Sequence, residues 1–439
     1  MHPLLRLVYG AAGAVARAAT VAGLPGTSKL ARAIRARRGA RARFAEWAAT
    51  SRDPARPLLW IHAPSVGEGL QARPILDLAR AQRDDVQLAY TWFSPSAATF
   101  ARALPVDIAD VLPFDTTIDA RALLDALRPT ALVFSKLDVW PILAAEAHAR
   151  GVPLGLISAT LAEGSSRRGL AGAFLRDAYA SLDAVGAIDE RDAARLVALG
   201  VRADRILVTG DARYDQVWAR AGSVDRAGPL LGPLVADRPT LVAGSTWPAD
   251  EAPLLAAWQD VVDRAPAAAR PRLIIAPHEP TPAHLVPIER WATAATLTVS
   301  RLGMPGARDA DVVLVDRVGV LGELYALADA AFVGGGFHAA GLHSVLEPAA
   351  FGAPVCFGPR YRSSRDAALL LDAGGGATAA TAAELAQTLR KWLHGGRGDA
   401  TARADAGRRA RALVLGGLGA AARSWALVER LLGPAARPA

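Results

Sequence analysis

Short apolar runs alternate with helix-like segments from residue 57 onward, and this alternation is the feature that most constrains the fold. One series of runs is 58–62, 87–91, 131–134, 153–158, 184–188 and 206–209, and a second is 240–243, 272–276, 311–315, 330–333 and 354–357. Helix-like segments such as 69–81 and 121–127 lie between the runs. Strands that alternate with helices form parallel sheets covered on both faces. The sequence therefore predicts an α/β fold.

A break separates the two series. It contains Gly222, Ser223, Gly228, Pro229, Gly232 and Pro233. We therefore expect an apolar and basic segment at 1–50, a domain at 51–215, a linker at 216–238, a domain at 239–420, and a helix and tail at 421–439 that pack back on the first domain. Both domains are expected to be doubly wound and Rossmann-like. They are expected to face each other across a cleft, the default place for a ligand.

Composition excludes several classes of protein. The 439 residues are 52% hydrophobic, which is too apolar for a disordered chain, and the single Cys356 cannot form a disulfide within the chain. The net charge is +8, but aromatic residues are only 6% and do not interleave with the basic ones. We therefore predict no nucleic-acid partner.

The N-terminal segment has a pattern of its own. Residues 3–24 are mostly apolar and small, and no acidic residue precedes Glu46. Between them lies a basic cluster of Lys29, Arg32, Arg35, Arg37, Arg38, Arg41 and Arg43. An apolar helix followed by cations is typical of a segment on the anionic cytoplasmic leaflet, and this is the interpretation we favour. A solvated arginine-rich helix packed on its own domain and a signal peptide are the alternatives.

Two motifs at strand ends of the first domain carry carboxylates. LLWIHAPSVGEG (58–69) places Glu68 between two glycines at a strand-to-helix turn, with a helix expected from about Leu70. There it could take a proton from a substrate hydroxyl, or simply favour the helix N-terminus by its charge. FSKLDVWP (134–141) offers Lys136 as an anion partner and Asp138 as a second carboxylate. For this motif alone, a charged loop with Trp140 in the core is the favoured reading.

Three motifs of the second domain suggest an anion or nucleotide site. TLVAGSTW (240–247) ends a strand in a Gly-Ser-Thr turn that could hold phosphate or cap a helix. LIIAPHEP (273–280) places His278 and Glu279 at a strand end. The stretch 330–359 joins a strand, Gly334–Gly336, His338, His343 and a helix from about Ser344 that carries Glu347. Glycine-rich backbone beside such a helix favours phosphate binding, and a carboxylate there can bind a ribose diol. The spacing of His and Cys predicts no metal site.

These motifs, taken in order, resemble the 3-deoxy-D-manno-octulosonic acid (Kdo) transferase family. The resemblance rests on SVGE (65–68), Trp-Pro (140–141), GSTW (244–247), APHEP (276–280), GELY-x-x-A-D (322–329) and GGG…HSVLEP…FGAPVCFGP (334–359). It implies a GT-B fold and an inverting, metal-independent glycosyltransferase of lipopolysaccharide synthesis. CMP-Kdo would be the donor, a lipid A precursor the acceptor, and no cofactor would be needed. The enzyme would lie on the cytoplasmic face of the inner membrane, either peripherally or through a single N-terminal anchor.

The resemblance also assigns roles to residues. Glu68 would be the general base, with Ser65, Gly67, Lys136 and Asp138 on the acceptor side. The donor would be held by Gly244, Ser245, Thr246, His278, Gly334, Gly335, Gly336, His343, Ser344 and Glu347. Three departures from the usual pattern affect these assignments. Ser135-Lys136-Leu137-Asp138 stands where many members have Glu-Thr-Glu, Glu279 follows His278 where many have Arg-His, and Ser344 replaces a common Asn.

Two other functions fit parts of the sequence. One is a GT-B enzyme that uses a UDP-sugar, as a transferase or an epimerase. The other is a non-catalytic adaptor at the membrane surface, in which the basic residues of 29–43 do the work.

Overall fold

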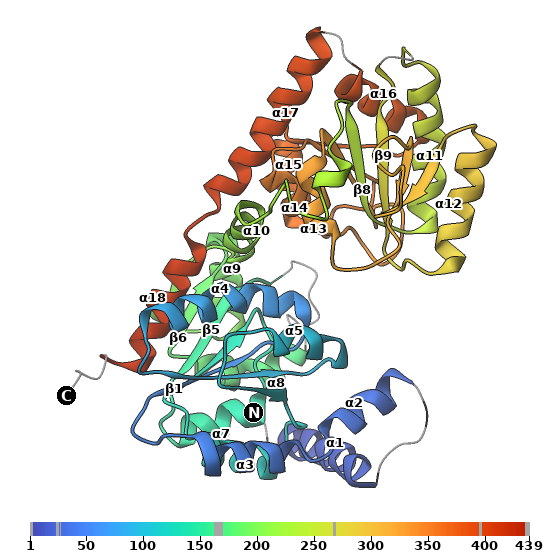
Figure 1. Cartoon of the computed structure of the whole chain (residues 1–439). Helices are drawn as coiled ribbons and strands as arrows, with labels where there is room; N and C mark the ends of the chain where they lie inside the picture. The colour runs from blue at the N-terminus through green and yellow to red at the C-terminus, as the bar shows by residue number, and fades with distance from the viewer. Residues whose placement is uncertain are drawn as a thin grey trace. The chain divides into compact units, whose positions relative to one another are not determined.

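The computed structural model of the chain describes residues 3–22, 26, 28–161, 170–266, 269–394 and 397–434. It divides into two compact units (Figure 1). Unit 1 comprises the described residues up to Gln216 together with those from Leu418 on, and unit 2 comprises Val217–Gly417. Each unit is built on one seven-stranded sheet in which every pairing is parallel. The predicted α/β class is confirmed in both halves of the chain.

The sheet of unit 1 has the strand order β3-β2-β1-β4-β5-β6-β7. Its strands are β1 (Leu58–His62), β2 (Gln87–Trp92), β3 (Ile108–Val111), β4 (Ala131–Ser135), β5 (Leu154–Ala159), β6 (Ala184–Ala187) and β7 (Ile206–Val208). Its helices are α1 (Pro3–Ala22), α2 (Lys29–Arg37), α3 (Ala40–Ser51), α4 (Val66–Gln82), α5 (Ala98–Arg102), α6 (Thr117–Leu127), α7 (Pro141–Ala149), α8 (Leu170–Ala180), α9 (Glu190–Leu199) and α18 (Ala420–Leu432).

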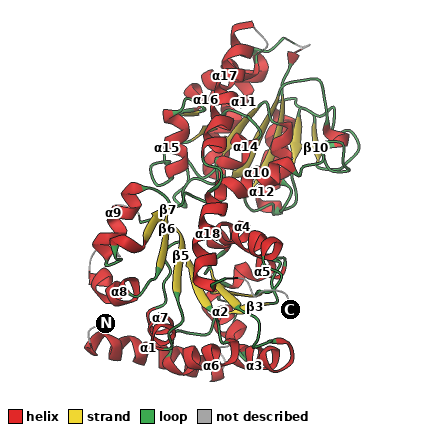
Figure 2. Cartoon of the chain, turned by 90° about the vertical axis from the view of Figure 1, so that its left-hand side faces the viewer, coloured by secondary structure: helices red, strands yellow, loops and turns green. Residues whose placement is uncertain are grey.

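Helices cover both faces of this sheet because its central strands are apolar on both sides. Leu58 and Trp60 belong to one core, which contains residues of α3, α6, α7 and α8. Leu59 and Ile61 belong to the opposite core, against α4, α5 and α18. Neighbouring residues of a strand point to opposite faces, so a fully apolar strand needs both layers. Figure 2 shows strands flanked by helices in this way.

The C-terminal helix α18 is part of unit 1, where it contacts α4, β5 and β6. Trp425 and Val428 are buried in the unit's core. Among the residues searched, the stretch Thr401–Leu432 is long and apolar enough to cross a membrane by length and composition. That stretch is interrupted at Gly419, whose φ of 84° precedes α18. Because α18 packs on the sheet, its apolar face is explained by the core of unit 1.

The sheet of unit 2 has the order β10-β11-β9-β8-β12-β13-β14. Its strands are β8 (Thr240–Thr246), β9 (Arg272–Pro277), β10 (Val299–Arg301), β11 (Val312–Leu314), β12 (Ala330–Val333), β13 (Val355–Phe357) and β14 (Gly376–Thr378). Its helices are α11 (Pro248–Asp263), α12 (Pro282–Ala294), α13 (Leu321–Leu324), α14 (Leu346–Ala350), α15 (Arg365–Asp372), α16 (Ala382–Leu393) and α17 (Arg397–Gly416). Residues of α11, α12 and α16 form the core on one face, and Leu231, Leu234, Leu324 and Tyr325 belong to the core on the other.

Part of the segment that was predicted to be a linker is helical. Helix α10 (Arg213–Gly222) runs through the end of unit 1 into unit 2. Its Tyr214 and Val217 are buried, at a spacing that places both on one helix face. The predicted linker 216–238 therefore includes the last residues of α10, and its glycines and prolines begin where that helix ends, at Gly222.

Candidate functional site

The strand order of unit 1 reverses direction between β1 and β4. These two strands are paired, and the chain leaves both at the same edge of the sheet. In doubly wound sheets, ligands bind beyond the carboxyl ends of the strands at such a point. Glu68 comes shortly after β1 and Lys136 directly follows β4. The topology thus brings together two residues that the sequence proposed from separate motifs.

Glu68 lies in the first turn of α4 and both of its carboxylate oxygens accept hydrogen bonds. The Ser65 hydroxyl donates to Oε2, and Lys136 Nζ donates to Oε1 at 3.1 Å. The side chain of Glu68 is 13% exposed and that of Lys136 is 45% exposed. Burial alone would raise the pKa of Glu68. The hydrogen bond from Ser65 and the charge of Lys136 lower it by more, so the pKa lies below its ordinary value. The carboxylate is therefore ionised at neutral pH and can accept a proton.

The two glycines that flank Glu68 differ in what surrounds them. A Cβ on Gly69 would lie 2.4 Å from a Phe100 ring carbon and 2.8 Å from the Tyr90 hydroxyl. A Cβ on Gly67 would meet only the Ser65 hydroxyl, at 3.7 Å. Both glycines lie inside α4, which begins at Val66 and not at about Leu70 as expected. Gly69 is thus required by packing, whereas Gly67, next to Glu68 in the sequence, is exposed and has open space around it.

The Trp-Pro pair is anchored by a residue that the sequence analysis did not select. Trp140 Nε1 donates to His62 Nε2 at 2.7 Å, and His62 Nδ1 lies 2.9 Å from the Thr91 hydroxyl. Complete burial, followed by the charge of Arg37, lowers the pKa of His62 to about 3, so the ring is neutral. Trp140 is therefore held in place between β4 and α7. Asp138 lies half-buried in the same connection.

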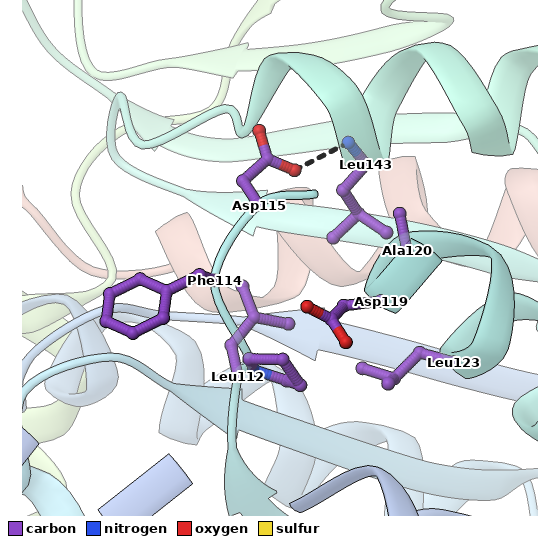
Figure 3. Close-up of a pocket in the computed structure, with 8 residues that line it drawn as sticks. Leu112, Phe114, Asp115, Asp119, Ala120, Leu123 and Leu143 are labelled. Carbon is purple, nitrogen blue, oxygen red and sulfur yellow. Dashed lines mark hydrogen bonds between the residues drawn. The ribbon is translucent and has the colours of Figure 1, made fainter. Parts of the chain in front are cut away.

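A second buried carboxylate, Asp115, fixes the start of α7. It accepts hydrogen bonds from the N–H groups of Ile142 and Leu143, at 2.9 and 2.8 Å, and from the Tyr9 hydroxyl at 3.0 Å. Figure 3 shows this carboxylate directed at the helix that carries Leu143. Burial raises the pKa of Asp115 to about 6, although these three donors oppose the shift. The same contact ties α1 to the rest of unit 1.

Unit 2 repeats the arrangement between β8 and β12. These strands are paired at the centre of the sheet, where the order reverses. Gly244, Ser245 and Thr246 are the last residues of β8, and Gly334–Gly336 follow β12. Ser245 has a left-handed backbone with a φ of 55°. The Thr246 hydroxyl is buried and donates to Glu251 at 2.9 Å. The proposed donor residues of the two motifs therefore meet at one edge of the sheet.

The three consecutive glycines form a tightly packed corner of the backbone. A Cβ on Gly334 would lie 2.2 Å from the Ser245 carbonyl oxygen, one on Gly335 2.1 Å from the Gly341 carbonyl oxygen, and one on Gly336 2.4 Å from the Gly358 nitrogen. Gly335 also has a φ of 91°. Each position therefore excludes a side chain. A Cβ on Gly244 would likewise lie 2.2 Å from the Tyr325 hydroxyl.

Asp250, in the first turn of α11, holds the glycine corner. It is fully buried and accepts hydrogen bonds from the N–H groups of Trp247, Gly335 and Phe337, at 3.0, 2.8 and 2.9 Å. The Gly334 N–H is used as well, because it donates to the Gly244 carbonyl at 2.9 Å. The amides of Gly334 and Gly335 therefore have internal partners, and these residues shape the corner by close backbone contact.

Four aromatic rings stack in a column beside this corner. Trp247 lies between His338 and His278, with ring centroids 4.6 and 4.5 Å apart, and His278 stacks on His343 at 4.6 Å. Trp247 Nε1 also donates to His343 Nε2 at 3.3 Å. Burial and, secondarily, the neighbouring His278 lower the pKa of His343. His278 and His343 were expected from separate motifs, and their stacking with Trp247 and His338 was not expected.

Glu347 is close to a cation that the sequence analysis also missed. It lies in the first turn of the short helix α14, which begins at Leu346 and not at about Ser344. Burial raises the pKa of Glu347, while the charge of Arg220 lowers it. The Arg220 guanidinium covers Gly322, where an added Cβ would lie 2.5 Å from it. Ser344 is exposed before α14. The amphipathic spacing of α10 was the available signal for Arg220.

Within the described part of the chain, no group of three or more His, Cys, Asp or Glu side chains is placed to hold a metal ion.

Comparison with known proteins gives a consistent result. A family model described as 3-deoxy-D-manno-octulosonic-acid transferase (kdotransferase) matches residues 36–216. A 3-deoxy-D-manno-octulosonic acid transferase of Bordetella pertussis is 32% identical over 355 residues, which cover 79% of this chain and 81% of the relative. One from Chlamydophila psittaci is 30% identical over 331 residues, covering 73% and 74% of the two chains.

Solved structures show the fold alone. The UDP-GlcNAc 2-epimerase from Neisseria meningitidis has a TM-score of 0.63 at 13% identity, over 86% of this chain and 100% of that chain. The UDP-N-acetylglucosamine 2-epimerase described as putative from Listeria monocytogenes has a TM-score of 0.58 at 13% identity, over 84% and 94%. These matches confirm the predicted class of two doubly wound α/β domains of the GT-B kind.

Proposed function

The chain belongs to the 3-deoxy-D-manno-octulosonic acid transferase family, and we propose that it is an inverting enzyme that moves Kdo from CMP-Kdo to a lipid A precursor. The observation that carries this proposal is the position of the Glu68 carboxylate at the switch point of unit 1, where it accepts hydrogen bonds from Ser65 and Lys136. The reaction needs neither a metal nor a further cofactor, because a carboxylate base and hydrogen-bond donors are sufficient for a single displacement.

In this reaction Glu68 is the general base. The acceptor hydroxyl gives its proton to the carboxylate while its oxygen forms a bond to the anomeric carbon of Kdo. The bond from that carbon to the phosphate oxygen breaks, and its electron pair leaves with CMP. The open space at Gly67 admits the acceptor beside Glu68, and Lys136 and Asp138 are its charged neighbours. Since Lys136 already pairs with Glu68, its cation also keeps the base ionised before the acceptor binds.

The donor is assigned to unit 2. Ser245 and His278 are the polar groups at the ends of β8 and β9, and Glu347 is the acceptor for the ribose hydroxyls. Gly244 and Gly334–Gly336 allow the backbone to pack closely enough to form the site. Thr246 and His343 help to hold the shape of the site, because Thr246 donates to Glu251 and His343 accepts from Trp247. Ser344, exposed before α14, completes the set.

We also place the enzyme on the cytoplasmic face of the inner membrane. One side of α1 exposes only small or apolar residues, namely Ala11, Ala12, Ala14, Val15 and Ala18. Leu30 is 63% exposed and is accompanied by exposed Arg32, Arg35 and Arg38. Apolar side chains beside cations suit the surface of an anionic bilayer. Because the opposite side of α1 is bonded to unit 1 through Tyr9, we propose that α1 lies on the bilayer.

The test compares Glu68→Gln with Asp77→Asn, which changes an exposed carboxylate on the same helix. Glu68→Gln should leave CMP-Kdo binding within about twofold while transfer to a tetra-acylated disaccharide acceptor falls by about 10²–10⁴. Asp77→Asn should preserve both. Near-normal transfer by Glu68→Gln would refute the base assignment. Stabilisation of the wild-type protein by UDP but not by CMP would refute the donor and support a UDP-sugar enzyme.

A further inference from the structure

Unit 1 contains a cavity of about 150 Å³ that none of the roles above uses. It lies between α1, the start of α3 and the segment that leads into α6, and its lining includes Arg17, Arg37, Arg41, Thr20 and Asp119. A fixed cavity lined by three guanidinium groups and one carboxylate has a net positive charge. The arrangement is built from helices that carry the N-terminal basic cluster, so it gives part of that cluster a specific geometry.

Arg37 is the unusual member of this lining. Its side chain is only 3% exposed, and no ion pair to it occurs in the described residues. Its two terminal nitrogens donate to the carbonyls of Ala33 and Phe93, at 2.7 and 2.8 Å, while the buried Nε has no partner. The guanidinium also lies 3.8 Å from the centre of the Phe93 ring. A buried charge is normally paired, because removal from water is costly.

Arg17 and Arg41 share a single counter-charge. Arg17 Nε and Arg41 Nη1 each lie 3.5 Å from Asp119 Oδ1, beyond an ideal hydrogen bond. The other oxygen of Asp119 is occupied by the Thr116 hydroxyl at 2.7 Å. Figure 3 shows the Asp119 carboxylate beside the adjoining small pocket that contains Leu112 and Ala120. The Asp119 carboxylate is therefore the shared, distant counter-charge of Arg17 and Arg41, and Arg37 has no counter-charge in the described residues.

The cavity is held in shape by contacts outside it. Tyr9 donates to Asp115, and a Cβ on Gly13 would lie 3.1 Å from Thr116. Tyr9, Gly13, Arg17 and Thr20 recur every three to four residues, so they share one face of α1. That face is fixed against the loop before α6, which keeps Arg17 and Thr20 at the cavity.

We propose that this cavity binds a phosphate group. Guanidinium groups match phosphate oxygens in charge and in the spacing of their donors. A phosphate here would place a negative charge beside the unpaired Arg37 guanidinium and would be the second counter-charge for Arg17 and Arg41. The group can come from a lipid headgroup or from free phosphate. Exposed Val15 and Leu30 on the adjacent helices offer contacts to the chains of a lipid. The inference does not depend on sugar transfer.

The test uses the whole chain, with Arg41→Gln and Arg17→Gln as cavity variants. Arg32→Gln is the matched control for general surface charge, because Arg32 is an exposed residue of α2 that does not line the cavity. One arm measures thermal stabilisation by inorganic phosphate against chloride at equal ionic strength. The other measures binding to phosphatidylcholine vesicles that contain either phosphatidic acid or phosphatidylglycerol at equal surface charge. Arg37→Met is a third cavity variant. If it does not fold, Arg17→Gln and Arg41→Gln, which change more exposed side chains, still test the proposal.

Either of two results supports the site. Saturable stabilisation by inorganic phosphate that Arg41→Gln weakens at least about tenfold, with Arg32→Gln within about twofold, identifies a site for free phosphate. Preference for phosphatidic acid vesicles that Arg41→Gln and Arg17→Gln abolish and Arg32→Gln retains identifies a headgroup site. Equal weakening by cavity and control variants would show a diffuse surface charge and overturn the proposal. Failure of the wild-type protein to bind in both arms would overturn it as well.

Discussion

Replacing Asp250 by alanine should loosen the glycine corner of unit 2 and destabilise that unit. The carboxylate is fully buried, and its three bonds to the amides of Trp247, Gly335 and Phe337 have lengths of 2.8–3.0 Å. Trp247 and Phe337 are half-buried and their amides can regain water, so only the buried Gly335 amide loses its partner outright. That orphaned amide costs about 1.5 kcal/mol and the lost helix cap about 1 kcal/mol. The expected loss is therefore about 2.5 kcal/mol.

The loss can be measured by thermal unfolding combined with hydrogen exchange. For a unit of this size, about 2.5 kcal/mol corresponds to a fall of roughly 5–10 °C in the transition of unit 2. The amides of Gly335 and Phe337 should exchange much faster than in the wild type, because their acceptor is gone. Asp263→Ala, at the exposed end of the same helix, is the control and should change neither quantity. A fall of less than about 1 kcal/mol, or unchanged protection of the corner, would refute the role of Asp250.

Three further predictions concern unit 1. Lys136→Met removes a cation that lowers the pKa of Glu68, so the decline of the transfer rate at acidic pH should move to higher pH. Lys136→Arg should restore the wild-type pH profile. An unchanged profile in Lys136→Met would contradict the pairing of Lys136 with Glu68. Gly69→Ala should lower the free energy of unfolding, measured in urea, by about 1–3 kcal/mol, because the added Cβ clashes with the Phe100 ring. Gly67→Ala should leave the free energy of unfolding unchanged. Equal effects of the two substitutions would exclude packing as the cause. Burial raises the pKa of Asp115 from 3.8 to about 6. The contribution of Asp115 to stability is therefore complete below pH 3.8 and is lost as pH rises through 6, so the melting temperature should fall over that range. Asp115→Asn should remove this pH dependence, and its persistence in the variant would assign it to another group.

The central strands were predictable from the sequence, whereas three edge strands were not. Buried strands such as β1 and β12 appear as uninterrupted apolar runs, because both of their faces are covered. The missed strands β3, β10 and β14 are all at sheet edges, and most of their residues are only partly buried or exposed. An edge strand needs less apolar sequence, so periodicity gives no clear signal for it.

The glycines of the candidate site were found correctly as positions, but their environments could not be inferred. The pattern around Glu68 suggested two equivalent glycines at a turn, yet both are helical and only Gly69 is confined by neighbouring rings. Gly334–Gly336 suggested amides free to bind phosphate, yet Asp250 accepts from one of them across 85 positions of the chain. The position of a glycine can be read from the sequence, but the atoms that surround it come from distant segments and cannot.

Buried charges are another kind of feature that could not be predicted from the sequence. Arg37 and Asp250 look like ordinary members of charged helices, because nothing in a helical pattern tells which charge will be covered by another segment. Once buried, they differ in one respect that can be tested. Asp250 has donors from three amides and is satisfied within the chain, so its role is structural. Arg37 has a buried nitrogen with no partner and a cavity beside it. Since an unpaired buried charge is costly, its retention is explained most directly by a negatively charged ligand.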